Sequence, residues 1–481
     1  MIRIASGLAS AAVLAACGAQ PASSPPGQAG PEPAPPVEAA AEESASGPDY
    51  TPRDLVVAHP EWARNAAIYQ INTRQFTPDG TFEAARAQLP RLAEMGIDIV
   101  WLMPVHPIGE VERKGSLGSP YAVRDFYGVN PEFGTLEDLR AFIADAHALD
   151  MHVILDWVAN HSAWDNPLVA EHPDWYTRDV DGEMQFPPGT DWSDVVDFNY
   201  DSPALRQYMT EVMAWWVRDV GVDGFRCDVA GMVPIDFWQT LRAELDQIKP
   251  TFMLAEWETR DHHDAAFSAT YAWSWNNTMH DIAMGDADVG AIRGYYFYDQ
   301  DNTWPDDAYR LTYTANHDQN AWVATQFDRW GEALEAVFAL SVVGEGVPMV
   351  YNGQEAGNPK MLEFFERDPI VWRDHPLNAH FTSLIGLLET NTAIWHGEAG
   401  GQMVDIANDA PAQVFSFVRE QGDDAVFAVF NFSGDARTVS FEAGPHAGAW
   451  TEFGTGEAAD FTGGGSVDMA AWGWRVFVRG D

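Results

Sequence analysis

The sequence predicts an α/β chain built on a (β/α)8 TIM barrel, with a loop excursion after the third strand and a C-terminal antiparallel β-domain. From about residue 65, short apolar runs alternate with segments of helical periodicity. These runs are apolar almost throughout, as is typical of parallel strands that are buried on both faces. After about residue 397, helical periodicity gives way to short strand-like runs separated by Gly, Asp and Asn.

The expected elements follow in chain order. Barrel strands are predicted at 67–71, 99–104, 152–157, 224–229, 252–257, 312–316 and 347–352, with a weakly marked strand at 271–275. Helices are predicted at 81–95, 135–149, 204–220 and 235–248. The largest insertion, 157–202, is rich in Trp, Asp, Pro and Gly, so we expect a folded excursion that forms one wall of a cleft. Strands of the β-domain are predicted at 414–418, 425–430, 438–441 and 474–478.

Four segments with different compositions divide the chain. Residues 1–17 carry one early charge, Arg3, before a short apolar run that ends in Leu14-Ala15-Ala16-Cys17. This ending resembles the lipobox of bacterial lipoproteins, which implies a signal peptide and an acylated Cys17; the alternative is an ordinary signal peptide. Residues 18–50 are rich in Pro, Ala, Ser, Gly and Glu and are predicted to form a disordered tether. The barrel is expected over 51–396 and the β-domain over 397–481.

These features predict an exported bacterial lipoprotein that touches a membrane through its lipid anchor only. Gly18, directly after the cysteine, favours the outer membrane by analogy. The other cysteine, Cys227, lies in an apolar run, so we expect a small buried side chain and no intrachain disulfide.

The charge balance limits the classes of ligand. The net charge is −45, from 72 acidic and 27 basic residues, and this excludes nucleic acid, whose phosphates need a basic surface. A neutral substrate such as a sugar suits this balance, and the 20 tryptophans favour a glycan. The acidic excess also fits a saline habitat, because salt relieves self-repulsion in a compact acidic protein.

Three predicted strands deliver carboxylates to one rim of the barrel. Polar residues at the carboxyl ends of barrel strands face the active site, and here these are Asp228, Glu256 and Asp318. Such a group is unfavourable without a function, because the charges repel one another and lose hydration.

Cleavage of a glycosidic bond supplies that function. A retaining hydrolase needs an ionised carboxylate as nucleophile and a protonated carboxyl as acid, about 5–5.5 Å apart. Neighbouring negative charge raises the pKa of the acid. Arg226 lies two residues before Asp228, so it shares a strand face with this carboxylate and can hold it ionised.

Four motifs at these strand ends resemble those of the α-amylase family of glycoside hydrolases, in the family's order. They are DWVANH at 156–161, GFRCD at 224–228, AEW at 255–257 and NHD at 316–318. Further similarity lies at 119–121, 125–127, 133–135 and 346–348, and the whole covers about 65–395.

The resemblance implies a role for each matching residue. Asp228 matches the nucleophile, Glu256 the general acid/base and Asp318 the carboxylate that stabilises the distorted sugar. Five further matches are Arg226 as partner of the nucleophile, His161 and His317 as donors to sugar hydroxyls, Tyr121 as the platform beneath the ring, and Asp156 as a buried support.

No cofactor is expected for this chemistry, although the resemblance leaves a bound Ca²⁺ open. Asn160 lies where many family members place a calcium ligand, but no acidic loop of suitable spacing accompanies it. The pair His262-His263 is expected to face solvent rather than bind a metal.

The segment after Asp228 departs from the pattern of many endo-acting amylases. Val229-Ala230-Gly231-Met232 contains no Lys-His pair and is more similar to neopullulanase and cyclomaltodextrinase relatives. Segment 196–199 also matches the family's fifth region only loosely. Starch, short maltodextrins, pullulan and cyclodextrins therefore all stay open as substrates.

The leading hypothesis is a retaining hydrolase of α-1,4-glucans or malto-oligosaccharides that works through a covalent glucosyl-enzyme. One alternative is a 4-α-glucanotransferase or related transglycosylase, because the same intermediate can pass to another sugar. Another is a non-catalytic glucan-binding surface lipoprotein, which the presence of all three carboxylates disfavours.

Overall fold

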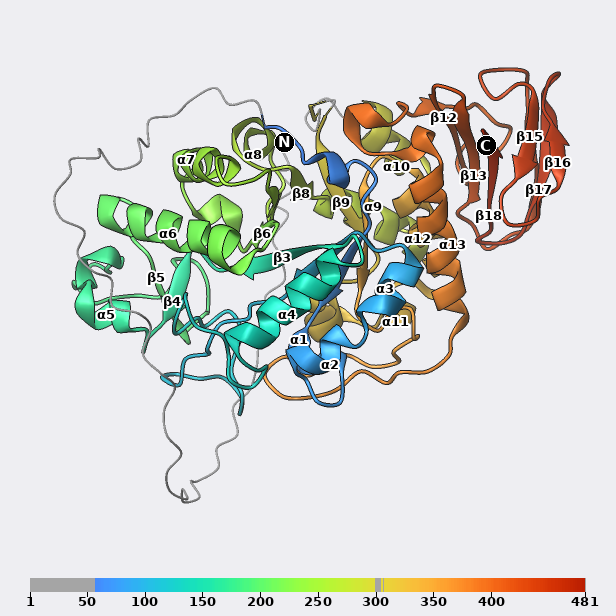
Figure 1. Cartoon of the computed structure of the whole chain (residues 1–481). Helices are drawn as coiled ribbons and strands as arrows, with labels where there is room; N and C mark the ends of the chain where they lie inside the picture. Colours follow the sequence, from blue (N-terminus) through green and yellow to red (C-terminus); the bar gives the residue numbers. More distant parts are fainter. Residues whose placement is uncertain (1–56, 299–303, 306, 481) are drawn as a thin grey trace, which may run out of the picture. The chain divides into compact units, whose positions relative to one another are not determined.

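The computed structural model describes residues 57–298, 304–305 and 307–480 (Figure 1). The predicted signal peptide, Cys17 and the tether at 18–50 lie outside the described residues.

Eight parallel strands close into a barrel in the order β1-β2-β3-β6-β7-β8-β9-β10 (Figure 1). Their bounds are β1 Ile68–Ile71, β2 Ile99–Leu102, β3 His152–Trp157, β6 Gly224–Cys227, β7 Phe252–Ala255, β8 Ala269–Tyr271, β9 Tyr309–Tyr313 and β10 Val347–Tyr351. The predicted TIM barrel is therefore confirmed. Two strands, β8 and β9, overlap the predicted ranges but begin and end before them, because residues 273–284 form a helix and Arg310 interrupts the apolar pattern of β9.

Helices cover the outside of this barrel. The longer ones are α4 Leu136–His147, α6 Pro203–Trp215, α7 Ile235–Asp246, α9 Trp273–Met284, α12 Leu334–Val343 and α13 Pro376–Thr390. The shorter ones are α1 Thr73–Phe76, α2 Phe82–Arg86, α3 Leu89–Met95, α8 Arg260–Ala265, α10 Gly290–Arg293 and α11 Gln326–Trp330, while α5 Pro167–Glu171 belongs to the insertion after β3. Across the described residues, every helix is too short or too polar to cross a membrane.

The helix predicted at 81–95 is two helices, α2 and α3. Pro90 lies in the first turn of α3, where a missing N–H costs nothing, whereas inside one continuous helix it would remove a hydrogen bond and clash with the preceding turn. At α4, Thr135 and Asp138 form a reciprocal capping box, which accounts for the sharp start of that helix.

The insertion after β3 is folded, as predicted. Strand β4, His161–Ala163, pairs antiparallel with β5, Val195–Asp197, and α5 lies between them in the sequence. Residue 161 is paired with residue 197, so the beginning of the excursion is tied to its end.

The C-terminal β-domain is confirmed as antiparallel. One sheet has the order β11-β12-β13-β18-β15-β16, and β14 pairs with β17. The bounds are β11 Val404–Asp405, β12 Val414–Gln421, β13 Asp424–Asn431, β14 Arg437–Phe441, β15 Ala449–Glu452, β16 Ala458–Asp460, β17 Gly465–Met469 and β18 Trp474–Arg479. The sequence pattern missed β11, β15, β16 and β17: β11 has only two residues, and the other three are short and carry exposed polar residues.

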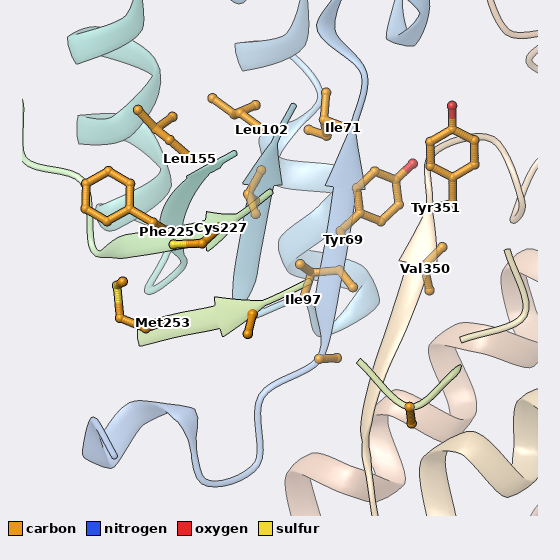
Figure 2. Close-up of a cluster of buried hydrophobic side chains, with 14 of the residues drawn as sticks. Tyr69, Ile71, Ile97, Leu102, Leu155, Phe225, Cys227, Met253, Val350 and Tyr351 are labelled. Atoms are coloured by element: carbon orange, nitrogen blue, oxygen red, sulfur yellow. The ribbon is translucent and has the colours of Figure 1, made fainter. Parts of the chain in front are cut away.

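Side chains of the barrel strands alternate between two buried layers. Inward-facing residues such as Ile68, Ile154 and Leu254 fill the barrel, while the alternate residues pack under the helices. Figure 2 shows the outer layer, with Tyr69, Leu102, Leu155, Phe225 and Met253 projecting from neighbouring strands. Cys227 belongs to this layer and is a free, buried thiol, as expected.

Candidate active site

The carboxyl ends of β3, β6 and β7 converge on one guanidinium group, that of Arg226. Its Nη1 donates to Asp156 Oδ1 at 2.7 Å and to Asp228 Oδ1 at 3.0 Å. Its Nη2 lies 2.9 Å from Glu256 Oε1. The side chains of Arg226 and Asp156 are 0% exposed, so the centre of this cluster is inside the protein.

Local packing directs Arg226 into the barrel. Two residues earlier, Gly224 has a φ of 154°, and a Cβ there would lie 1.9 Å from the Phe252 carbonyl oxygen. Only glycine allows this close contact between β6 and β7. Arg226 shares the inward face of β6 with Gly224, because side chains two residues apart point the same way.

Aromatic rings complete the surroundings of the guanidinium. Trp101, Tyr271 and Tyr121 have their ring centroids 5.2, 5.6 and 5.8 Å from its central carbon. Burial alone would lower the pKa of Arg226, but the carboxylates of Asp156 and Glu256 hold it well above its ordinary value. The cation is therefore permanent.

Asp156 is hydrogen-bonded at both oxygens. Besides the bond from Arg226, Oδ2 accepts from Trp101 Nε1 at 3.1 Å and from the Tyr121 hydroxyl at 2.9 Å. Burial raises the pKa of Asp156 to about 6, against the opposing effect of Arg226. All of these donors are protein groups, so Asp156 holds Arg226, Trp101 and Tyr121 in place.

Asp228 and Glu256 lie at the open end of the cluster. Their side chains are 10% and 13% exposed, so both reach the surface of the site. Burial, followed by the charge of Glu256, raises the pKa of Asp228 well above its ordinary value.

Val229 holds Glu256 through its backbone. The Val229 N–H donates to Glu256 Oε2 at 2.8 Å, with a backbone φ of 37° and ψ of 47°. This left-handed conformation is a rare one for a β-branched residue and costs roughly 1–3 kcal/mol. At Gly231 a Cβ would lie 2.0 Å from the Trp257 indole, so the divergent segment after Asp228 is shaped to pack against the residue that follows Glu256.

His317 links the third predicted carboxylate to the cluster. Its Nε2 lies 2.8 Å from the Tyr121 hydroxyl and 3.4 Å from Asp318 Oδ2. Burial lowers the pKa of His317 to about 3, so the ring is neutral. The Asp318 side chain is 45% exposed, the most accessible of the three carboxylates.

Gln70 is a member of this network that the sequence pattern missed. Its side-chain nitrogen Nε2 lies 2.7 Å from His317 Nδ1, and its Oε1 accepts from the backbone N–H of His317 at 3.2 Å. Gln70 is fully buried on β1. A glutamine inside an apolar strand was the available signal, because a buried amide needs partners.

His161, the other histidine predicted to contact the sugar, lies on β4 of the insertion rather than at the end of a barrel strand. It is buried, and Trp192 lies beside it at a centroid distance of 5.6 Å. Burial lowers the pKa of His161 to about 3, against the opposing effect of the Tyr121 backbone. The ring is therefore neutral beside the loop that carries Tyr121.

The surroundings of Asn160 do not form a calcium cage. Its Nδ2 donates to Asp197 Oδ1 at 3.3 Å, and Asp197 Oδ2 accepts from Thr177. This single carboxylate falls far short of the six to eight oxygens that calcium takes. Within the described part of the chain, no three His, Cys, Asp or Glu side chains form a group that could hold a metal ion.

The expectation that His262 and His263 face solvent is wrong. Both are buried in α8, at 4% and 6% exposure. His263 Nε2 bonds to the Thr270 hydroxyl at 2.8 Å, and the His262 ring packs near Phe267 at 5.5 Å. Helix α8 turns the face that carries His263 toward β8. Two adjacent histidines in the sequence do not reveal which way their helix faces.

Comparison with known proteins identifies the family. The family model described as Alpha amylase, catalytic domain, matches residues 69–393, and that described as Alpha amylase, C-terminal all-beta domain, matches residues 405–475. The Alpha-amylase MalA of Haloarcula japonica is 27% identical over 440 residues, which cover 87% of this chain and 62% of that protein. An alpha-1,4-glucan:maltose-1-phosphate maltosyltransferase of Pseudomonas aeruginosa is 28% identical over 458 residues, which cover 87% and 66%. The chain thus spans less than two thirds of either relative.

Two similar solved structures align with this chain over nearly their whole length. The noncanonic maltogenic alpha-amylase AmyB of Thermotoga neapolitana is 31% identical, with a TM-score of 0.75 over 87% of this chain and 97% of that one. An alpha-amylase of Lactobacillus plantarum is 29% identical, with a TM-score of 0.76 over 87% and 99%. This chain belongs to the alpha-amylase family.

Proposed function

We propose that this chain hydrolyses α-1,4-glucosidic bonds of starch-derived glucans or maltodextrins through a covalent glucosyl-enzyme. The observation that carries the proposal is the contact of one buried guanidinium, Arg226, with Asp156, Asp228 and Glu256. The permanent cation favours ionised carboxylates, while burial and the repulsion between the carboxylates favour the retention of a proton among them. An ionised carboxylate and a protonated one are the two states that a retaining glycosidase needs.

In the proposed reaction, Asp228 attacks the anomeric carbon while the bond from that carbon to the glycosidic oxygen breaks. The departing oxygen takes its proton from Glu256. Glu256, now ionised, removes a proton from water, whose oxygen attacks the anomeric carbon and releases Asp228. Only side chains and water take part, so the chemistry requires no cofactor.

The remaining residues are proposed to hold the cleaved sugar. The Tyr121 hydroxyl is occupied by Asp156 and His317, so Tyr121 is proposed to contact the sugar through its ring. The exposed carboxylate of Asp318 is free to accept bonds from sugar hydroxyls. Neutral His161 is proposed as a donor to these hydroxyls. Both ring nitrogens of His317 already lie against Gln70 and Tyr121, so His317 is proposed to position the Tyr121 ring instead.

Transfer to a second sugar is the alternative with its own support, because maltosyltransferases are among the relatives. We expect wild-type enzyme incubated with maltotriose to yield glucose and maltose, because water is the proposed acceptor. Chromatography of the products checks this. Oligosaccharides longer than maltotriose as the main early products would replace the hydrolase with a glucanotransferase.

Replacing Glu256 by Gln tests the acid/base assignment. The amide keeps the size of the side chain but cannot donate a proton, so we expect kcat on maltoheptaose to fall roughly 10²–10⁴-fold. Binding of maltoheptaose should persist, and the thermal unfolding midpoint should fall without loss of the fold, because the amide cannot accept from both Arg226 and Val229. The matched control is Glu398→Gln, at an exposed position, which should retain full activity. Retained turnover in the Glu256 variant would remove this residue from the mechanism and favour another proton donor.

The raised pKa of Asp228 predicts the acid limb of the pH profile. Asp228 attacks only when ionised, and its raised pKa means that protonation begins at a higher pH than for an ordinary aspartate. We therefore expect kcat/KM on maltotriose to fall, as the pH decreases, with a midpoint above about 3.9. Circular dichroism at the same pH values separates this loss from unfolding. A folded enzyme whose activity persists down to the ordinary aspartate range would contradict the proposed environment of Asp228.

We also propose that Cys17 carries a lipid anchor that tethers the enzyme outside the cytoplasm, with the outer membrane favoured. In a bacterial host fed labelled palmitate, wild-type chain should carry label and sediment with membranes. Cys17→Ala should lose the label, whereas Cys227→Ala, at the second of the two cysteines, should keep it. Unlabelled, soluble wild-type chain would indicate an ordinary signal peptide.

A further inference from the structure

Four aromatic side chains form a continuous row that begins at Tyr121, and we call this set the rim aromatic row. Tyr121 stacks on Phe364 with centroids 6.2 Å apart and planes 9° apart. Trp322 lies 5.1 Å from Phe364 and 5.6 Å from Phe365. The row ends in Trp322, which is 45% exposed.

Hydrogen bonds between loops hold this row in place. The Leu117 N–H donates to the Phe365 carbonyl at 3.1 Å, which joins the loop of Tyr121 to the loop after β10. The Leu362 N–H donates to Asn320 Oδ1 at 3.0 Å, which joins that loop to the turn carrying Trp322. The rings are thus held by three segments before any ligand arrives, so little ordering entropy opposes binding on them.

The row lies across the barrel from the proposed proton donor. Glu256 follows β7 and Asp228 follows β6, whereas Trp322 follows β9, Phe364 follows β10 and Tyr121 follows β2. Glu256 must face the leaving oxygen, so the departing part of the substrate lies on its side of the cleaved sugar. The row occupies the arc of the rim that runs from β9 through β10 and β1 to β2.

We propose that the rim aromatic row binds the sugar units on the non-reducing side of the cleaved bond of an α-glucan chain. The inference rests on the proposed function, because that function assigns the cleaved sugar to Tyr121. Aromatic faces suit the apolar C–H faces of glucose rings, and a chain lying over Tyr121 continues onto Phe364 and Trp322. Such contact removes the exposed indole from water, which is favourable for a large apolar surface.

The test replaces Trp322 by Ala, with Val323→Ala as the matched control. Val323 is the adjacent residue and is 58% exposed, so its truncation also removes exposed apolar surface but no ring. Two substrates are compared: maltoheptaose, whose chain extends past Tyr121 onto Phe364 and Trp322, and α-glucosyl fluoride, whose single sugar reaches Tyr121 only. We expect the ratio of kcat/KM on maltoheptaose to that on the fluoride to fall roughly tenfold in the Trp322 variant, the loss of one modest contact. The control should keep the wild-type ratio.

Reducing-end-labelled maltoheptaose reports which side of the bond the row serves. Loss of binding on the non-reducing side should move cleavage toward the non-reducing end, giving longer labelled products. Movement in the opposite direction would overturn the assignment, as would an unchanged ratio. Concentration-dependent self-association of wild-type chain, lost in the Trp322 variant with unchanged kinetics, would identify the row as a contact between copies and also overturn it.

Failure of the proposed function would look different. Wild-type enzyme that cleaves neither substrate would refute the hydrolase itself. In that case the Kd of maltoheptaose, measured by tryptophan fluorescence in wild type and in the Val323 and Trp322 variants, still tests the row. A weaker Kd in the Trp322 variant alone would support it, and equal Kd values would refute it.

Discussion

The arrangement of the site depends on the buried guanidinium of Arg226. Removing a cation from water is unfavourable unless its charge is matched, and here Asp156, Asp228 and Glu256 match it at 2.7, 3.0 and 2.9 Å. The dependence is mutual, because without Arg226 three carboxylates would share a water-poor space and take up protons. One side chain therefore sets both the distances between the acidic groups and the protons they hold.

The barrel makes this charge cluster possible because its paired strands fix the backbone positions of the residues that carry the charges. Gly224 allows β6 and β7 to approach until a Cβ would overlap the Phe252 carbonyl, and this brings the ends carrying Asp228 and Glu256 together. Just beyond, Val229 adopts an unfavourable left-handed conformation that aims its N–H at Glu256. Such strain persists only where the surrounding packing over-determines it, as a closed eight-stranded barrel does.

A second layer of neutral polar groups links this cluster to the rim. Gln70 holds the backbone and ring of His317, His317 meets the Tyr121 hydroxyl, and that hydroxyl donates to Asp156. The chain of bonds connects strands β1 and β3 with two loops of the rim. It also leaves the Tyr121 ring in line with Phe364, so the buried charges and the exposed aromatic surface belong to one connected arrangement.

The sequence by itself determined the barrel, the β-domain and the set of strand-end carboxylates. The apolar runs and polar residues that mark them are local patterns, and the geometry of parallel strands brings their ends to one rim. Where the local signal was weak, as in β8, β9 and the short strands β15 and β16, the pattern misplaced or missed the element. Only the tertiary structure decided the burial of His262 and His263, the place of Gln70 and the row of Tyr121, Phe364 and Trp322. These depend on contacts between segments far apart in the chain, and no local pattern of residue types records which distant atoms will meet.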